Sequence, residues 1–476
     1  MRILVLANLH GNGKRAVPLA LRKPLAIHVD NAEAVLTRLA PSLSLSIETP
    51  EGSAEAVELE FRQIEDFHPD RLFRQADAFV GLRGLHEELT NPATFARAAA
   101  ALGLHPADGA PASADTAVSS AESNADTIER LLGRAPAQQA SHNPDLVDKL
   151  LHDAVAPHVV QDHSAAQAQA ITVLDALIAD RMRRILRQPA FQSLEAAWRW
   201  VWKLATELET GDALQINVLD ISREELAADL QAHAEDLSAS ALHRVLSGPE
   251  TAGEEGMPWS LLLGDFTFGP DDAAMLAALG ALAGRAGAPF LAGGSPALVG
   301  CINLQEPGSP AQWPPLAGEV GAVWQALRQS PLAVWIGLAL PRLLVRLPYG
   351  AASDPIETFA FEEMAGDRRH EHYLWGNPAY ALAFLAAQAY SEEGWEMDVG
   401  ARLVIEDLPS HVYRNKDGEA EQQACAEVWL SETVAEAILD RGVMPILSYR
   451  NRNAARLLRW QSIALPPTAL AGLKAD

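Results

Sequence analysis

Cysteine is nearly absent from this sequence: Cys301 and Cys425 are the only two in 476 residues. Two cysteines cannot build a disulfide framework or a zinc module with cysteine ligands. No motif surrounds either of them, so we expect both to be small buried core residues. This usage is typical of a protein that works in a reducing cytosol.

Positive charge is also scarce, because 37 Lys and Arg face 62 Asp and Glu and give a formal net charge of −25. Such a surface repels phosphate groups, whereas nucleic-acid binding needs cations that release counterions. We therefore expect no nucleic-acid partner and no binding to anionic lipid.

Long hydrophobic runs are missing as well. No uninterrupted apolar stretch reaches the ~18 residues of a membrane-spanning helix, so we expect no membrane insertion. The apolar run in Met1–Leu6 is too short for a signal peptide and lacks a small-residue cleavage pattern. These absences predict a soluble, acidic, cytoplasmic protein.

What is present is a globular composition, with 49% hydrophobic residues and enough chain for roughly three domains. Residues 105–142 are the exception, because Ala, Ser, Asp, Pro and Gln dominate there and few large apolar residues can be buried. Such a segment predicts a flexible linker. It divides the chain into a first module, residues 1–104, and a second module, residues 143–476.

The first module has the pattern of a small α+β unit. A compact apolar run at Ile3–Ala7 predicts a strand. Apolar residues then alternate with serines over 43–47 and with glutamates over 57–61, which predicts a hairpin. A Pro and an acid at Phe67–Asp70 predict a helix start, followed by apolar residues at helical spacing.

The second module predicts a helical lead-in over 143–212 and an α/β core over 213–476. Apolar residues at helical spacing over 171–185 and 194–208 predict two packed helices. Strand and helix patterns then alternate, which gives an α/β fold class, mixed α+β overall. No internal repeat is visible. The candidate strands are Leu214–Ile221, Trp259–Phe268, Pro289–Ala292, Leu343–Leu347, Leu403–Ile405, Ala426–Ser431 and Met444–Tyr449.

A phosphate-binding loop is the first candidate for chemistry, at His10-Gly11-Asn12-Gly13-Lys14 after the first strand. A P-loop needs a Gly four residues before the Gly-Lys pair and a Ser or Thr after it. Asn8 stands where that first Gly would be, and Arg15 follows Lys14 in place of the Ser or Thr. We therefore interpret the segment as a plain turn.

The other candidates are also incomplete. His370-Glu371-His372 could hold a metal but has no third cluster of ligands nearby. Glu362 and Glu363 point to opposite faces if they lie in a strand, so a salt-bridged pair with Arg342 or Arg346 is favoured over a general acid and base. Gly293–Ala297 lacks the final Gly of a nucleophile elbow. We predict no catalytic residue, no cofactor and no metal site, and hence no enzyme.

Four stretches of the first module and seven of the second, taken in order, carry a family likeness. The first set resembles the small sheath subunit of the bacterial type VI secretion system, and the second set resembles its large sheath subunit. The stretches are Arg2–Leu6, Val29–Asn31, Leu39–Leu43 and Phe61–Asp70, then Phe191–Arg199, Leu214–Leu230, Gly264–Phe268, Leu340–Arg342, Arg346–Gly350, Phe359–Glu363 and Tyr373–Ala381.

The resemblance implies a structural part of a contractile sheath. Protomers of small and large subunits stack around an inner tube, and strands donated across sheets stitch neighbours together by β-augmentation. The implied partners are the chain itself, other sheath subunits, the inner tube protein, the baseplate and an AAA+ unfoldase that recycles contracted sheath. The expected assembly strands are Arg2, Ile3, Leu4, Val5 and Leu6, and Ala426, Glu427, Val428, Trp429, Leu430 and Ser431.

The resemblance also implies a helix for the unfoldase to grip. Its matching positions are Pro144–Val155, with Leu146, Val147, Leu150 and Leu151 on one face. In this chain the two subunits are fused, which fixes a 1:1 ratio. The large-subunit part is also expected to be shortened after the stretch matched by Cys425–Ile463.

Two other functions stay open at this point: an adaptor that binds sheath subunits without polymerising, and a cytosolic α/β enzyme with no recognisable motif. If Arg2–Leu6 serves assembly, deletion of Met1–Ala7 is expected to impair association more than folding. Trp198 and Trp202 lie at i, i+4 and are interpreted as core residues, with an interface anchor as the alternative.

Overall fold

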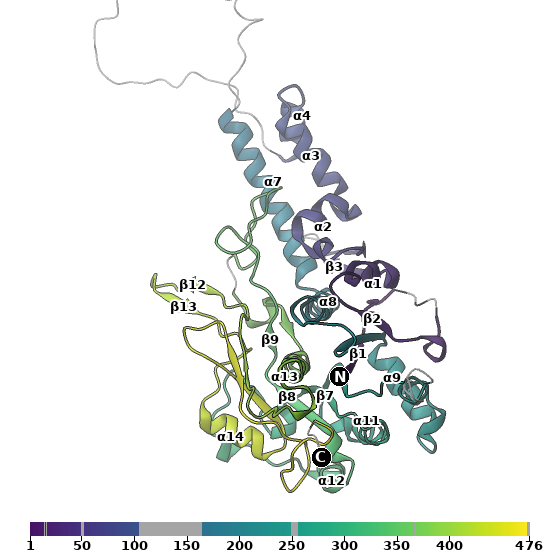
Figure 1. Ribbon diagram of the computed structural model, residues 1–476. Helices are drawn as coiled ribbons and strands as arrows, with labels where there is room; N and C mark the ends of the chain where they lie inside the picture. Colours follow the sequence, from purple (N-terminus) through teal and green to yellow (C-terminus); the bar gives the residue numbers. More distant parts are fainter. Residues whose placement is uncertain are drawn as a thin grey trace, which may run out of the picture. The chain divides into compact units, whose positions relative to one another are not determined.

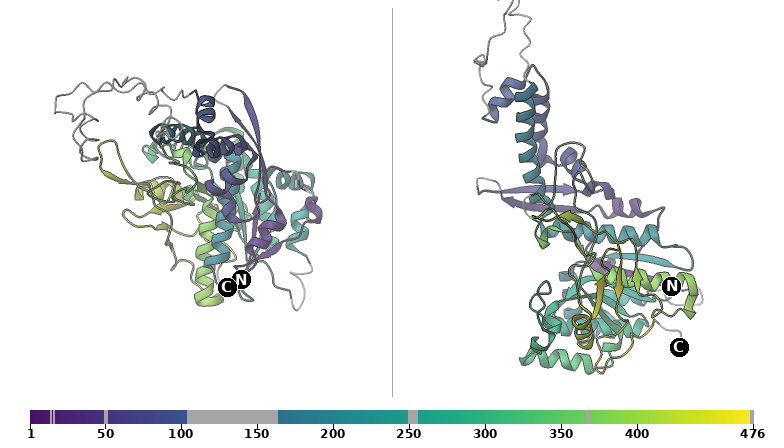
Figure 2. Two further views of the ribbon diagram at one scale, coloured as in Figure 1. Left: turned by 90° about the horizontal axis from the view of Figure 1, so that it is seen from above. Right: turned by 90° about the vertical axis from the view of Figure 1, so that its left-hand side faces the viewer.

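Two compact units make up the chain, one formed by Met1–Val80 with Ala176–Asp476 and one by Gly81–Asp175. The computed structural model describes residues 1–13, 15, 17–48, 52–103, 164–248, 256–365 and 368–473. Figure 1 shows the elements along the chain, and Figure 2 shows them from two further sides. The predicted linker, 105–142, and the predicted unfoldase helix, 144–155, lie outside the described residues.

A nine-stranded sheet forms the centre of the larger unit, in the order β11-β15-β14-β8-β7-β6-β1-β5-β2. The pairs among β5, β1, β6, β7, β8 and β14 are parallel, while β2, β15 and β11 join antiparallel. The strands are β1 (Arg2–Ala7), β2 (Leu25–Ile27), β5 (Gln215–Asp220), β6 (Leu261–Phe268), β7 (Phe290–Gly294), β8 (Ile336–Leu340), β11 (Val404–Ile405), β14 (Met444–Ser448) and β15 (Ala455–Leu457).

Helices cover both faces of this sheet. Leu4 and Leu6 of β1 share a core with Leu226 and Leu276, which lie on helices of one face. The elements that supply this core are α9 (Arg223–Ala232), α10 (Ala241–Leu246), α11 (Ala273–Ala286), α12 (Gly318–Gln329) and α14 (Glu432–Asp440). The other face carries α8 (Pro189–Glu207) and α13 (Pro378–Glu393), whose Trp200 and Tyr380 rings stack at 5.7 Å.

Among its described residues this unit also contains three two-stranded sheets, the end of α7 (Ser164–Leu186) and two short α-helices. β3 (Ser42–Glu48) and β4 (Ala54–Glu60) form the predicted hairpin. β9 (Leu343–Leu344) pairs with β10 (Trp375–Gly376), and β12 (Val412–Arg414) pairs with β13 (Ala420–Gln422). The helices are α1 (Ala32–Leu39) and α2 (Pro69–Gln75).

The smaller unit is helical where it is described. It contains α3 (Val80–Thr90), α4 (Phe95–Ala101) and the start of α7 (Ser164–Leu186). The Gln167 side chain donates to the carbonyl of Leu89 at 2.7 Å and so fastens α7 to the end of α3. No helix among the described residues is long and apolar enough to cross a bilayer.

The predicted α/β class is confirmed, and so are the hairpin and the helices α7 and α8. The strand expected at Ala426–Ser431 is wrong, since only Ala426 forms a β-bridge there, to Leu343. The compact units also divide the chain differently from the sequence modules. Residues 1–80 fold together with 176–476, because β1 needs neighbours on both sides and finds them in β5 and β6.

Candidate functional site at the junction of the two sequence modules

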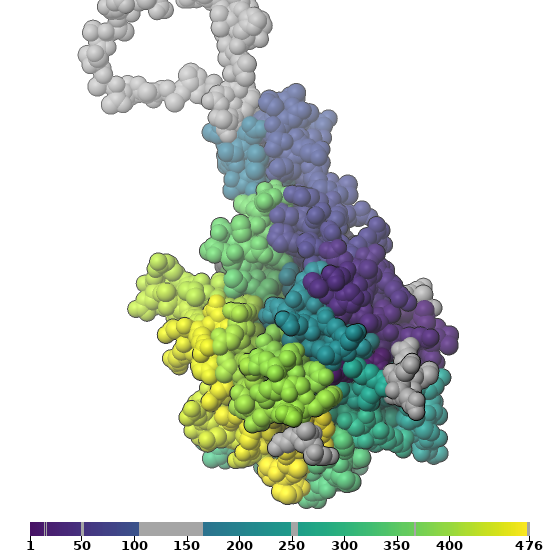
Figure 3. Space-filling view, in the orientation of Figure 1, coloured from purple at the N-terminus to yellow at the C-terminus, as the bar shows by residue number. Residues whose placement is uncertain are grey.

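The chain brings its two sequence modules together in one continuous junction, defined here as the contacts between residues 1–80 and 176–473. Its centre is β1, whose six residues are all buried. Arg2–Ala7 pairs with Gln215–Asp220 of β5, and Ile3–Leu6 pairs with Leu261–Gly264 of β6. In Figure 3 the purple surface of the first module lies directly against the teal surface of α8 and α9.

Both edges of β1 are therefore occupied within the chain. The first two residues are held as well, since the Met1 amino group donates to the carbonyl of Ala213 and the Arg2 guanidinium lies 4.0 Å from the Trp259 ring centre. Arg2 also donates to the carbonyl of Met257 at 3.0 Å. Assembly through Arg2–Leu6 would have to exchange these pairings for the same pairings in another copy.

The glycine-rich loop after β1 binds a carboxylate of the protein itself. The N–H groups of Leu9 and His10 donate to Asp220 Oδ1 at 2.9 and 3.0 Å. Arg15 Nε donates to Asp220 Oδ2 at 2.8 Å. Asp220 ends β5, so the anion that this loop holds comes from the second module. The loop is a turn, as predicted, and Lys14 lies outside the described residues.

Close packing against β3 explains the glycines of this loop. Gly11 has φ +82°, and a Cβ there would lie 2.4 Å from the Ser42 carbonyl oxygen. A Cβ at Gly13 would lie 2.2 Å from Ser42 Oγ. The Asn12 side chain also pairs with both main-chain groups of Ser44, at 2.8 and 2.9 Å. The loop thus closes the outer edge of β3.

A second polar contact ties the first module to the start of α9. Arg22 donates to both carboxylate oxygens of Glu225, at 2.8 and 2.6 Å, and to the carbonyl of Asp220 at 2.9 Å. Glu225 also closes the capping box with Ser222 at the helix N-terminus. Burial raises the pKa of Glu225, but the hydrogen bonds from Arg22 and Ser222 outweigh it, so the pKa is lowered overall.

Aromatic packing supplies the apolar part of the junction. Phe61 and Phe67 stack at 4.2 Å, and both meet the edge of Phe191 on α8, at 6.0 and 5.8 Å. Trp198 on the same helix donates its indole N–H to the carbonyl of Leu9 at 2.9 Å. Trp198 is fully buried, so it is the core residue that its spacing predicts. Each aromatic pair adds ~0.5–1.5 kcal/mol to the effect of burial.

Asp70 fastens α2 to a loop of the second module. Its carboxylate accepts from the N–H groups of Glu357 and Thr358 at 3.1 and 3.0 Å and from the Thr358 hydroxyl at 2.5 Å. Burial raises the pKa of Asp70, but these hydrogen bonds lower it by more. The acid expected at the helix start is present, and its carboxylate also binds a segment 287 residues away.

A buried cluster of charges lies next to the junction. Arg346 contacts Glu195 of α8 at 2.7 Å and Glu363 at 2.7 Å, and Arg199 contacts Glu195 at 2.8 Å. Both carboxylates are almost fully buried, and each is compensated by a guanidinium, as buried charges require. The predicted ion pair of Glu363 with Arg346 is confirmed, while Glu362 is exposed and accepts from the N–H of Ala351.

Glu427, predicted in an assembly strand, anchors its segment inside the fold. Its carboxylate accepts from Arg342 at 2.6 and 3.1 Å and lies 2.7 Å from His370 Nε2. Burial raises the pKa of Glu427, but Arg342 and His370 overcome it and lower the pKa to about 2. The N–H of Leu344 donates to the carbonyl of Cys425, so this segment lies along β9 instead of forming a free strand.

The remaining sequence motifs also have structural roles. His370–His372 is a 3-10 helix, and no group of three metal-binding side chains occurs among the described residues. Ser295 Oγ accepts from the N–H of Ala297 at the start of a 3-10 helix. Both cysteines are buried, as expected, and burial raises the pKa of Cys425 to about 11.

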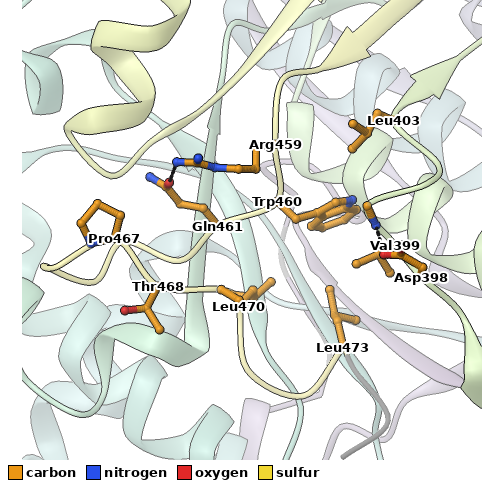
Figure 4. Close-up of a pocket in the computed structure, with 12 residues that line it drawn as sticks. Asp398, Val399, Leu403, Arg459, Trp460, Gln461, Pro467, Thr468, Leu470 and Leu473 are labelled. Atoms are coloured by element: carbon orange, nitrogen blue, oxygen red, sulfur yellow. Dashed lines mark hydrogen bonds between the residues drawn. The ribbon is translucent and has the colours of Figure 1, made fainter.

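A hollow near the C-terminal segment offers no chemistry either. It has a volume of about 420 Å³ and is lined mainly by apolar side chains, among them Leu403, Trp460, Leu470 and Leu473 (Figure 4). Each of its two charged residues forms a hydrogen bond with a residue two positions away in the chain. Arg459 donates to the Gln461 side chain at 2.9 Å, and Asp398 accepts from the N–H of Gly400 at 2.8 Å.

Sequence reasoning did not identify Asp220, Arg22, Glu225 or Asp70 as junction residues. The one signal was an acid at the end of the strand Leu214–Ile221, with a glycine-rich loop after another strand. Only the parallel pairing of β1 with β5 brings the two together. The residues expected to bind an unfoldase, Leu146, Val147, Leu150 and Leu151, lie outside the described residues.

Comparisons with known proteins match both modules. A family model for VipB (EvpB/VC_A0108, tail sheath N-terminal domain) matches residues 168–464. A model for VipA of the type VI secretion system (VipA, VC_A0107 or Hcp2) matches residues 1–99. The type VI secretion system sheath protein TssC1 of Pseudomonas aeruginosa is 32% identical over 308 residues, which cover 62% of this chain and 61% of TssC1.

Proposed function

We propose, because this chain belongs to the tail sheath family of the type VI secretion system, that it is a structural subunit which associates with copies of itself in a sheath or sheath-like assembly. The family is structural and not enzymatic, so the prediction that the chain is not an enzyme is confirmed. The match to small-subunit and large-subunit models in one chain was predicted from the sequence and is also confirmed.

The observation that carries the proposal is the position of β1. A strand from the part that resembles VipA is buried between two strands of the part that resembles VipB. The two parts therefore share one core, and one copy of this chain supplies both parts of a protomer. Fusion keeps the ratio of the parts at 1:1 and their effective concentration high.

Strand donation between protomers belongs to the same proposal. If β1 of one copy inserts between β5 and β6 of the next, every pairing of β1 is reproduced between copies, which is domain swapping. Ala426–Ser431 would take part through its side chains, because the main chain at its start is already engaged: Ala426 bridges Leu343, and the N–H of Glu427 donates to the carbonyl of Arg342. We also place the protein in the cytoplasm, with an inner tube protein, a baseplate, other sheath subunits and an AAA+ unfoldase as its partners.

Negative-stain microscopy of the purified full chain, with and without an inner tube protein, tests this function. Tubes or rings are the expected result. Uniform single particles in both samples would overturn it. If those particles bind separately purified sheath subunits, the adaptor function is the correct one.

A further inference from the structure

A basic hollow lies beside the edge strand β2, in a chain whose net charge is −25. Its volume is about 340 Å³, and its lining includes Arg15, Arg22, Lys23 and Arg38 but only one acid, Asp220. Arg15 and Arg22 are paired with Asp220 and Glu225 inside the junction. Lys23 and Arg38 are exposed and form no ion pair with the described residues.

Apolar side chains surround these two free cations. Leu21 is 72% exposed and Val17 is 46% exposed, and both line the same hollow. Exposed large apolar side chains grouped with cations are typical of a contact surface, whereas single ones need no explanation. The hollow therefore has the composition of an interface that receives a partner with acidic groups.

This partner cannot bind by adding a strand to β2. The Asn31 side chain donates to the carbonyl of Ala26 at 3.0 Å and accepts from the N–H of His28 at 2.8 Å. These two bonds occupy the main-chain carbonyl of Ala26 and N–H of His28, which would otherwise be open to an added strand at the outer edge of the three-residue β2. The contact must be made by side chains, and charge then decides which partner fits.

A surface of complementary charge exists on the chain itself, along the outer edge of β4. The N–H of Phe61 donates to the carbonyl of Pro41, so the main-chain groups of Ala56, Glu58 and Glu60 face away from β3. No described strand pairs with this edge. A hollow of about 530 Å³ lies along it, and its charged lining consists of four acids, Glu58, Glu60, Asp66 and Asp77, and one cation, Arg62. Arg62 lies 3.5 Å from Glu60, but both side chains are largely exposed, so this pair is weak and the lining stays acidic overall.

We infer that the basic hollow of one copy binds the acidic β4 edge of a second copy, with Lys23 and Arg38 facing Glu58 and Glu60. This inference rests on the proposed function and names the surfaces through which copies meet. The exposed glutamates keep other acidic strands away from the open edge, so the edge admits a cationic partner selectively.

Two charge reversals and their mixture test the pairing. The variants of the full chain are Lys23→Glu with Arg38→Glu, and Glu58→Lys with Glu60→Lys. Arg285→Glu with Lys416→Glu, two exposed residues elsewhere, is a control that changes the net charge as the first variant does. Assembly is followed against protein concentration by sedimentation velocity and negative-stain microscopy, and folding by circular dichroism.

Each reversal alone should raise the concentration needed for assembly at least about tenfold, because like charges then meet in the contact. An equimolar mixture of the two should restore assembly, while the control should assemble like the unmodified chain. All variants should keep the unmodified unfolding temperature within a few degrees, since the changed side chains are exposed.

The outcomes separate this inference from the proposed function. If the unmodified chain assembles and the reversals assemble equally well, the inference is overturned and the proposed function stands. If the reversals lose assembly but the mixture does not regain it, these two surfaces are not partners. A monodisperse unmodified chain would overturn both.

Discussion

The two segments expected to act as assembly strands have opposite fates in the fold. Arg2–Leu6 becomes an inner strand of a nine-stranded sheet, with both edges paired. Ala426–Ser431 forms no strand and is held through the half-buried carboxylate of Glu427, which pairs with Arg342 and His370. A continuous apolar run predicts a central strand, whereas a free edge is marked by charged residues, as in β4. The comparison shows that apolar content is a poor guide to an assembly edge.

Deletion of Met1–Ala7 tests whether β1 is needed for folding and has the largest expected effect. Removal of β1 leaves β5 and β6 without their shared neighbour, so we expect the cooperative unfolding transition to disappear. This prediction from the structure differs from the one drawn from the sequence, which expects association to suffer more than folding. Circular dichroism and intrinsic fluorescence on heating measure the effect.

A single substitution in β1 tests the same role of the strand without removing it. Leu4→Ala should destabilise the chain by about 2–5 kcal/mol, because Leu4 is fully buried in the core of the sheet. A shortened chain that unfolds at the unmodified temperature would show that the pairing of β1 is dispensable and would return Arg2–Leu6 to a role in assembly alone.

Much of the fold could be predicted from local patterns. The alternation in β3 and β4, the helical spacing in α7 and α8 and the capping residues at Ser222 all act within a few residues of chain. The junction could not be predicted in the same way, because Asp220, Glu225 and Asp70 each bind groups about 200 to 290 residues away in sequence. Polar contacts over such separations leave no periodic signal in the sequence.

Glu427→Gln tests whether the carboxylate of Glu427 anchors the segment Ala426–Ser431, and we expect an intermediate effect on stability. At pH 7 we expect a loss of about 1–2 kcal/mol in the free energy of unfolding, because Arg342 and His370 lose their charged partner. The folded-state pKa of about 2 lies below the ordinary value of 4.5. The stabilisation is therefore complete above pH 4.5 and falls as the pH drops toward 2.

Denaturant unfolding of both proteins between pH 7 and pH 3 measures this difference. The difference in the free energy of unfolding between the unmodified chain and Glu427→Gln should become steadily smaller below pH 4.5. Glu419→Gln, at an exposed position on a turn, is the matched control and should leave the free energy unchanged. A gap that stays constant down to pH 3 would mean that the carboxylate of Glu427 is not the anchor.

Trp429→Ala should have the smallest effect on stability. Trp429 is 37% exposed, and Arg450 lies over its ring at 5.5 Å. A partly exposed cation–π contact contributes about 0.5–1 kcal/mol, so thermal unfolding should shift by a few degrees at most. If assembly is lost while stability is kept, the segment acts in assembly through this side chain. Unchanged assembly would leave it a purely structural segment.

The place of β1 also sets an order of events during synthesis. β1 leaves the ribosome before either of its neighbours, because its partners Gln215 and Leu261 lie more than 200 residues later in the chain. At ~5–20 residues per second the strand waits on the order of tens of seconds for both neighbours. During that time an apolar strand with two open edges is exposed to other nascent chains. Copies made on one polysome would meet during this interval, when strands exchange most easily.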